Sequence, residues 1–176
     1  MGVDPREVKN FVAKNMRSSF HLNVRSLANK EDDPAIGISF DIIMLRETWY
    51  TQRSCGFELP GYQLFPLSRQ DKRGGSVALL VKDSIQCESI NEFCAMIPDY
   101  EVLSLRSKGC IFSVVLYGQP SGDVRKFLSF LDTFFNLVAE QAVDLILGGD
   151  INVNMLAPTS IQKEMQSLIT SRGLPT

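Results

Sequence analysis

Apolar and polar residues alternate along much of this chain in the manner of short β-strands. In residues 19–24 every second side chain is apolar, so we expect a strand with one polar face that carries His21 and Asn23. The next apolar run, residues 40–45, is almost uninterrupted, which predicts a strand buried on both faces. Four later apolar runs predict four more strands: residues 76–81, 101–105, 111–117 and 144–147.

Helical periodicity is clearest in residues 122–140. Four apolar residues there follow one another at spacings of four, three and four, which places them on one stripe of a helix: Phe127, Leu131, Phe134 and Val138. Thr159-x-x-Gln162 has the form of a capping box and predicts a last helix that Gly173 terminates. Residues 5–16 predict a short N-terminal helix, because an aspartate and a proline stand at its start.

Strands joined by tight turns and interrupted by helices predict an α/β or α+β fold, with helices on the outer faces of the sheets. Lys108-Gly109 indicates a hairpin turn, whereas residues 51–75 carry turn signals and are expected to form a loop. With 176 residues and no internal repeat or linker, the chain is long enough for one domain with a substantial core.

Composition narrows the class of protein. The formal net charge of -2 provides no overall field for nucleic acid, so such binding would need a local basic patch. The four cysteines form no C-x-x-C pair and there is one histidine, which argues against a zinc site. Cysteines without an evident pairing pattern are typical of a protein in a reducing compartment. No apolar run approaches the roughly 20 residues that span a bilayer, so we expect an intracellular protein without a membrane partner.

The most informative segment chemically is residues 145–154, an apolar run that ends in Gly148-Gly149 and continues as Asp150-Ile151-Asn152. Residues two apart in an extended chain project from the same side, so we expect Asp150 and Asn152 to lie together. The glycines place no side chain between the backbone and a ligand. A carboxylate beside an amide suits a hard cation and a phosphate. The same sequence pattern, an apolar run followed by Gly-Gly-Asp, also occurs in ordinary turns.

Polar residues and glycines follow one another along the predicted strands in a fixed order: Asn23, Glu47, Gly74-Gly75 opening a strand, Tyr117, and Gly149-Asp150-Ile151-Asn152. This order resembles the endonuclease/exonuclease/phosphatase superfamily of metal-dependent phosphodiesterases. The sequence motifs at residues 22–30, 40–49, 59–62, 69–75 and 147–152 resemble the same superfamily. More closely, it is similar to the apurinic-type endonuclease domain of non-LTR (LINE-like) retrotransposons. The resemblance covers residues 18–176 and leaves residues 1–17 as a helical lead-in.

The resemblance implies an α/β fold of two packed mixed β-sheets flanked by helices, a four-layer α/β-β/α sandwich that we expect to be incomplete at its C-terminus. It also implies cleavage of a DNA phosphodiester with Mg²⁺, or alternatively Mn²⁺, and without a small-molecule cofactor. A protein from an active retroelement would work in the nucleus, although the sequence shows no targeting signal. The oligomeric state is left open.

The resemblance also assigns roles by matching position. Glu47 is expected to be the principal metal ligand, with Asn23 supporting the metal and the phosphate. Asp150 would orient or deprotonate the attacking water, Tyr117 would donate to a phosphate oxygen, and Asn152 would hold the phosphate. Few protein carboxylates are needed, because Mg²⁺ keeps several of its waters.

A basic run is the candidate contact with DNA. Arg69, Lys72 and Arg73 would bind the phosphate backbone, where lysine and arginine supply affinity that is independent of sequence. The same run also fits an ordinary solvated turn.

The chain departs from the family pattern in three ways. No closing Ser-Asp-His is present, and we expect His21 to be an ordinary strand residue at the wrong end of the chain. Losing an acid–base partner costs about 10²–10⁴-fold in rate, so little or no activity is expected, together with an unpaired edge in the second sheet. Arg46 replaces a small polar residue and, on a strand, should point away from Glu47. Residues 25–39 are short for a crossover.

Two alternative functions stay open. One is a non-catalytic retroelement remnant that binds DNA weakly through the basic run. The other is a different phosphoesterase of the same superfamily, such as a phosphatase, a deadenylase or a sphingomyelinase-like enzyme. The sequence motifs at residues 22–30 and 40–49 resemble those of the retrotransposon endonucleases, which argues against this second alternative.

Overall fold

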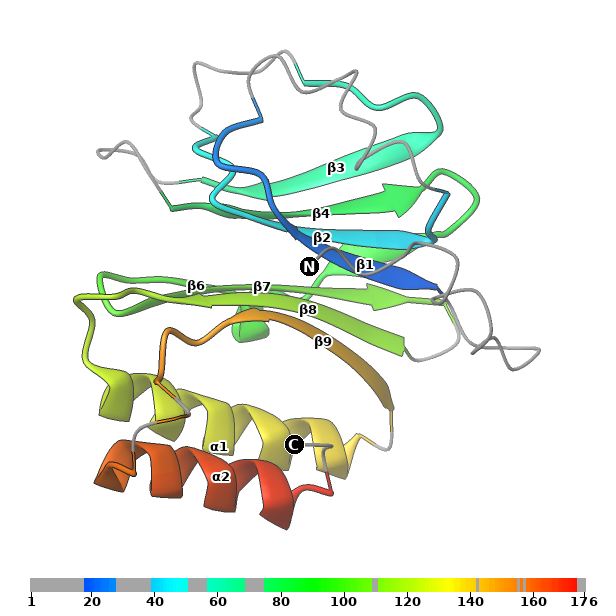
Figure 1. Ribbon diagram of the computed structural model, residues 1–176. Helices are drawn as coiled ribbons and strands as arrows, with labels where there is room; N and C mark the ends of the chain where they lie inside the picture. Colours follow the sequence, from blue (N-terminus) through cyan, green and yellow to red (C-terminus); the bar gives the residue numbers. More distant parts are fainter. Residues whose placement is uncertain are drawn as a thin grey trace.

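The computed structural model describes residues 18–27, 39–50, 57–68, 75–108, 111–141, 143–154, 156 and 158–173. In this part of the chain two β-sheets pack face to face, and both described helices cover the outer face of the second sheet (Figure 1). The predicted helix at residues 5–16, most of the connection at residues 25–39 and the basic run at residues 69–73 lie outside the described residues.

The first sheet has four strands in the order β1-β2-β4-β3, with the bounds Ser19–Asn23, Ile42–Arg46, Val77–Lys82 and Tyr62–Leu67. β1 and β2 run parallel, whereas β4 is antiparallel to β2 and β3. The carboxyl ends of β1 and β2 therefore lie at the same edge as the start of β4.

The second sheet has the order β5-β7-β8-β9, with the bounds Cys87–Ser89, Tyr100–Ser107, Ile111–Gly118 and Asp144–Asp150. A two-residue strand, β6 (Ala95–Met96), also pairs with β7, and a short 3-10 helix, η2 (Asn91–Phe93), precedes it. β7 and β8 form the predicted antiparallel hairpin. β8 and β9 are parallel because the helix α1 (Val124–Glu140) crosses over between them.

Alternating side chains on the strands feed three apolar clusters. One lies between the sheets and includes inward residues of β2 and β7 such as Met44 and Leu105. A second lies between α1 and the second sheet, where Phe127, Leu131 and Phe134 are almost fully buried. Burying each such side chain stabilises the fold by roughly 1.5–3 kcal/mol. The third cluster covers the outer face of the first sheet.

Local sequence signals explain how the helices begin. The side chain of Asp123 accepts hydrogen bonds from two backbone amides in the first turn of α1. The helix α2 (Ser160–Ser171) begins as predicted, because Thr159 Oγ1 accepts from the backbone amide of Gln162 at 3.1 Å. Gly173 then takes a left-handed φ of 65°.

The sequence predicted two mixed sheets flanked by helices, and this is confirmed. The helical layer over the first sheet stays a prediction, since no described helix lies there. Residues 51–75 are not all loop: β3 forms there, and Pro66 is tolerated because β3 is the edge strand. β9 is longer and less buried than expected, since it is the last strand of its sheet among the described residues. Neither α1 nor α2 is both long and apolar enough to cross a lipid bilayer.

Candidate active site

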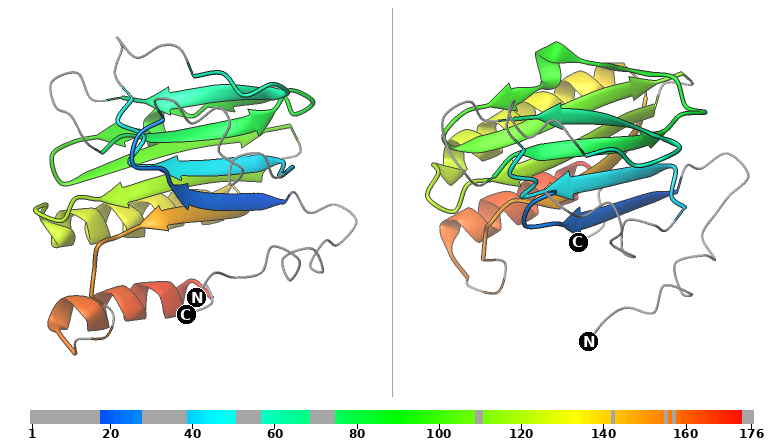
Figure 2. Two further views of the ribbon diagram at one scale, coloured as in Figure 1. Left: turned by 45° about the horizontal axis from the view of Figure 1, so that its top comes forward. Right: turned by 90° about the horizontal axis from the view of Figure 1, so that it is seen from above.

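The candidate site lies where strand ends of both sheets meet. In the left view of Figure 2, the arrowheads of β1, β2 and β9 (blue, cyan and orange) point to the same side of the molecule. Two polar contacts bridge the sheets at this edge. Tyr117 at the end of β8 donates to Glu47 after β2, and Arg46 of β2 forms an ion pair with Asp150 of β9. Side chains that are up to 104 positions apart in the sequence therefore form one polar cluster.

Glu47 reaches this cluster through an unusual backbone conformation. Ile43 and Leu45 belong to the cluster on the outer face of the first sheet, so a continued strand would direct residue 47 outward as well. Glu47 instead has a φ of 56°, which is rare for a residue with a side chain. Such a conformation costs of order 1–3 kcal/mol and persists only where the surroundings fix it.

The carboxylate of Glu47 is held by three donors. Oε1 accepts from the Tyr117 hydroxyl at 2.5 Å. Oε2 accepts from the Trp49 indole at 3.0 Å and from the Gly75 backbone amide at 3.4 Å. Partial burial acts to raise the pKa of Glu47, but these hydrogen bonds and the charge of Arg46 outweigh it and lower the pKa. Glu47 is therefore ionised at neutral pH.

Tyr117 stays protonated under the same conditions. Burial, the hydrogen bond to Glu47 and the nearby negative charge raise the pKa of Tyr117 to about 12. The sheets thus meet through a neutral hydroxyl donor and a charged acceptor, which is the stronger kind of hydrogen bond.

Asp150 and Asn152 do not project side by side from an extended strand, as the sequence analysis expected. β9 ends at Asp150, and Asn152 has a φ of 51°. The Asn152 backbone amide donates to Asp150 Oδ1 at 2.9 Å, while its side-chain amide turns to the Gly118 carbonyl at 2.6 Å. Asn152 therefore fastens the end of β9 to the end of β8.

The two glycines before Asp150 serve packing rather than access for a ligand. A Cβ on Gly149 would lie 2.0 Å from the Leu116 carbonyl oxygen of the neighbouring strand, at a φ of 146°. A Cβ on Gly148 would lie 2.5 Å from the Met44 sulfur on the opposite sheet. Only glycine allows β9 to approach both neighbours this closely.

Arg46 does not point away from the site, which corrects the sequence-based expectation. Ile42 and Met44 of the same strand point into the core between the sheets, so Arg46 also points inward by alternation. The turn at Glu47 then brings the carboxylate to the side where Arg46 already lies. The Arg46 side chain is 20% exposed and binds Asp150 through Nη1.

His21 also lies beside the site, although the sequence analysis set it aside. It points from β1 toward β9, where a Cβ on Gly148 would lie 3.7 Å from the His21 Cβ. Burial and the charge of Arg46 lower the pKa of His21, against a smaller opposing effect of Asp150. It is a strand residue, as expected, and although it stands near the start of the sequence, parallel β1 and β2 carry it to the junction. Its place on the same strand face as Asn23 was the available signal.

The other predicted site residues are placed only in part. Asn23 ends β1 in register with Arg46, and its Oδ1 accepts from the Arg25 backbone amide at 3.2 Å. Arg69, Lys72 and Arg73 lie outside the described residues, so their predicted contact with DNA stays a prediction.

The donor set fits Mg²⁺ in chemical type. Carboxylate and amide oxygens of Glu47, Asp150 and Asn23 are the hard ligands that this ion prefers, and it needs few of them. The described residues contain no group of three or more His, Cys, Asp and Glu arranged to hold a metal. The oxygens of Glu47 and Asp150 are also engaged by protein donors.

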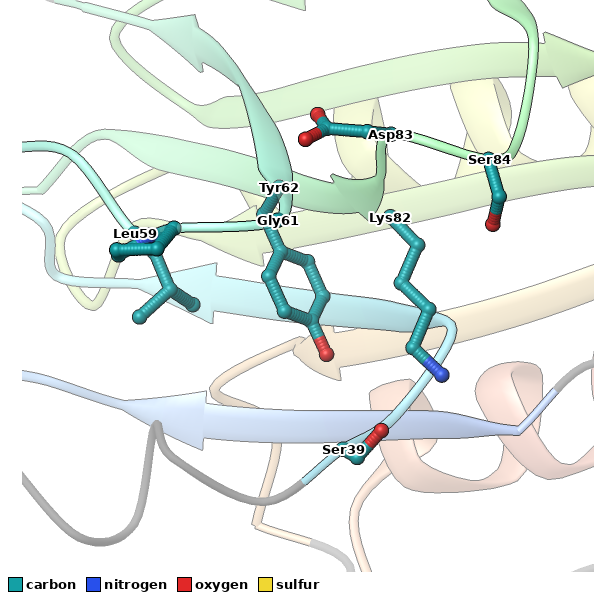
Figure 3. A pocket seen from close by; sticks show the side chains of 8 residues that line it. Ser39, Leu59, Gly61, Tyr62, Lys82, Asp83 and Ser84 are labelled. Carbon is teal, nitrogen blue, oxygen red and sulfur yellow. The ribbon is translucent and has the colours of Figure 1, made fainter.

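A cavity of about 420 Å³ opens at the opposite end of the first sheet (Figure 3). Two of the polar side chains that line it have partners within the protein. Tyr62 donates to the Phe40 carbonyl at 2.6 Å, and Lys82 pairs with Asp41 at 3.1 Å. None of the predicted site residues lines this cavity.

No protein-family model and no curated protein matches the sequence. Solved structures do match. The endonuclease domain of TRAS1, a telomere-specific non-LTR retrotransposon, has 14% identity and a TM-score of 0.65, over 90% of this chain and 71% of that one. The AP endonuclease LMAP from Leishmania major has 16% identity and a TM-score of 0.63, over 95% of this chain and 72% of that one. The 3′ phosphatase NExo from Neisseria, bound to product DNA, has 14% sequence identity and a TM-score of 0.55, over 88% of this chain and 71% of that one.

At these identities the likeness establishes the fold. The chain has the α/β sandwich fold of the endonuclease/exonuclease/phosphatase superfamily, which is the fold of metal-dependent phosphodiesterases. The fold that the superfamily resemblance implied is thereby confirmed.

Proposed function

We propose that this domain is a Mg²⁺-dependent phosphodiesterase of the DNA-nicking kind found in non-LTR retrotransposons, and that on its own it has little activity. The observation that carries the proposal is the Glu47 carboxylate, ionised and held by Tyr117, Trp49 and Gly75 where the two sheets meet. The fold shared with the TRAS1 endonuclease domain supports the retrotransposon part of the proposal.

Each side chain has a role that suits its environment. Glu47 and Asn23 would hold the cation, which supplies charge stabilisation to the phosphoryl oxygens when it is bound. Tyr117 remains protonated, and its hydroxyl would have to turn from Glu47 to donate to a phosphate oxygen. Asp150 would orient or accept a proton from the attacking water, and Asn152 would hold the phosphate beside it.

Low activity follows from the state of Asp150. Its Oδ2 is engaged by Arg46 and its Oδ1 by the Asn152 amide, so an attacking water has to compete with protein donors for both oxygens. A general base that is withheld in this way costs about 10²–10⁴-fold in rate.

Two measurements test the proposal. Nicking of supercoiled plasmid in the presence of Mg²⁺ measures activity, and binding of Mn²⁺ measures the metal site without requiring turnover. We expect slow or undetectable nicking, and Mn²⁺ binding that is lost in Glu47→Ala. Rapid nicking that disappears in Glu47→Ala would overturn the claim of low activity. Mn²⁺ binding that survives in Glu47→Ala would reject Glu47 as the ligand.

The Arg46–Asp150 ion pair also favours a second candidate, a domain that binds DNA without cleaving it. Fluorescence anisotropy with a labelled duplex should then show binding that weakens steeply with salt. Neutralising Arg69, Lys72 and Arg73 together should abolish that binding. A different phosphoester substrate is a further alternative, because a 3′ phosphatase shares the same fold.

A further inference from the structure

The charges at the site are arranged around Arg46. Its positive charge acts on the ionisation of Glu47, Tyr117 and His21, and it forms the ion pair with Asp150. These four side chains come from β1, β8, β9 and the turn after β2. The guanidinium pairs directly with Asp150, and Arg46 directly precedes Glu47, so it is adjacent to both carboxylates of the site.

The setting of Arg46 differs from that of a surface ion pair. Only 20% of its side chain is exposed, and its Nε is buried with no hydrogen-bond partner among the described residues. A buried N–H without a partner is costly, so this pair is a poor means of stabilising the fold. The Asp150 side chain is 32% exposed and can be hydrated if Arg46 is removed.

We propose that Arg46 is a built-in counter-cation that opposes divalent-cation binding at this site. The inference rests on the proposed function, in which Glu47 and Asn23 hold Mg²⁺. Arg46 neutralises one of the two carboxylates at the site, and its charge repels a dication that approaches Glu47. Coulomb repulsion between a unit charge and a dication a few ångströms apart is large even in a medium of high effective dielectric.

Variants at Arg46 separate charge from packing. Arg46→Met keeps an apolar stem in the inter-sheet core and removes the charge, and Arg46→Gln is a second neutral variant that remains polar. Arg46→Lys keeps the charge. Arg125→Met changes the net charge of the protein equally at an exposed position of α1, where Arg125 pairs loosely with Glu164 at 3.8 Å.

Isothermal titration with Mn²⁺ alone is the measurement, supported by quenching of Trp49 fluorescence. Trp49 is the single tryptophan of the chain and donates to Glu47, so its emission reports on the site. We expect Arg46→Met and Arg46→Gln to lower the Kd for Mn²⁺ about tenfold or more. Arg46→Lys and Arg125→Met should stay within about threefold of the parent protein.

The remaining outcomes separate the two proposals. If the parent protein binds Mn²⁺ in a Glu47-dependent way and the neutral Arg46 variants bind no more tightly, Arg46 is not a counter-cation and the metal site stands. If neither the parent nor Arg46→Met shows Glu47-dependent binding, the proposed metal site fails and this inference with it. A gain that shrinks in an Asp150→Asn background would show that Arg46 acts through Asp150.

Discussion

Single residues at the site carry backbone conformations that their types disfavour. Glu47, Trp49 and Asn152 all have φ values near 50°. At Glu47 the reversal brings the carboxylate to the Tyr117 hydroxyl, and at Asn152 it brings the side chain to the end of β8. The hydrogen bonds that follow from these conformations offset part of their strain.

Replacing Tyr117 by phenylalanine should raise the pKa of Glu47 and destabilise the protein in a pH-dependent way. The lowered pKa of Glu47 in the folded state contributes stability above its unfolded pKa, and this contribution is lost as pH falls through the folded pKa. Tyr117→Phe should therefore cost about 1.5 kcal/mol at pH 7, and less in acid where Glu47 is protonated. Urea unfolding across pH, with a carboxyl NMR titration, measures both effects.

Tyr62→Phe is the matched control for this prediction. Tyr62 donates to a backbone carbonyl, which does not titrate, so its loss of about 1 kcal/mol should not vary with pH. Equal pH dependence in the two variants would mean that the Tyr117–Glu47 bond does not set the pKa of Glu47.

Among the elements, β9 decides the geometry of the second sheet's half of the site. It lies parallel to β8, and its glycines allow it to approach both β8 and the first sheet. The position of Asp150 opposite Arg46 follows from that close approach. A strand with ordinary side chains at residues 148 and 149 would be displaced from both neighbours.

Gly149→Ala should destabilise the protein by about 3 kcal/mol or more, since the added Cβ meets the Leu116 carbonyl at a strained φ. Gly61→Ala is the control, because Gly61 also has a positive φ of 85° but no atom within 4 Å of an added Cβ. It should cost only about 1–2 kcal/mol. Urea midpoints compare the two, and equal losses would show that crowding at β9 is unimportant.

At the scale of the whole molecule, the site depends on how two sheets pack. The inter-sheet core holds Glu47 near Tyr117, whereas the core beneath α1 supports the second sheet from its other face. The two cores are separate clusters, so a substitution in the core beneath α1 should disturb the site less than a substitution in the inter-sheet core. The sheets therefore have to be packed correctly before the charges of the site meet.

Leu105→Ala in the inter-sheet core and Phe134→Ala under α1 should both cost about 3–4 kcal/mol. Only Leu105→Ala should shift the emission of Trp49 in the folded state, because Trp49 binds Glu47 at the sheet junction. Unfolding in urea and native-state emission spectra measure this. A shift of the same size in Phe134→Ala would show that the site is equally coupled to both cores.

Most of the fold was predictable because strand and helix periodicities are local properties of the chain. The strands at β1, β2, β4, β7, β8 and β9, both described helices and the cap at Thr159 were expected from pattern alone. β3 was missed because turn signals in residues 51–75 predicted a loop, and its place at the sheet edge accommodates Pro66. β5 and β6 were missed because two or three residues show no period.

For the candidate site, the sequence determined which residue types stand at the strand ends, and hence the superfamily resemblance and the choice of Glu47, Tyr117 and Asp150. Alternation predicted the strands, whereas the choice of these residues came from the resemblance, since alternation alone would direct Glu47 outward. Only the tertiary structure decided that Arg46 pairs with Asp150 and that His21 lies beside them. Those contacts depend on the approach of two sheets, and the contact of Glu47 with Tyr117 also depends on a left-handed turn at Glu47; neither is encoded in the spacing of neighbouring residues.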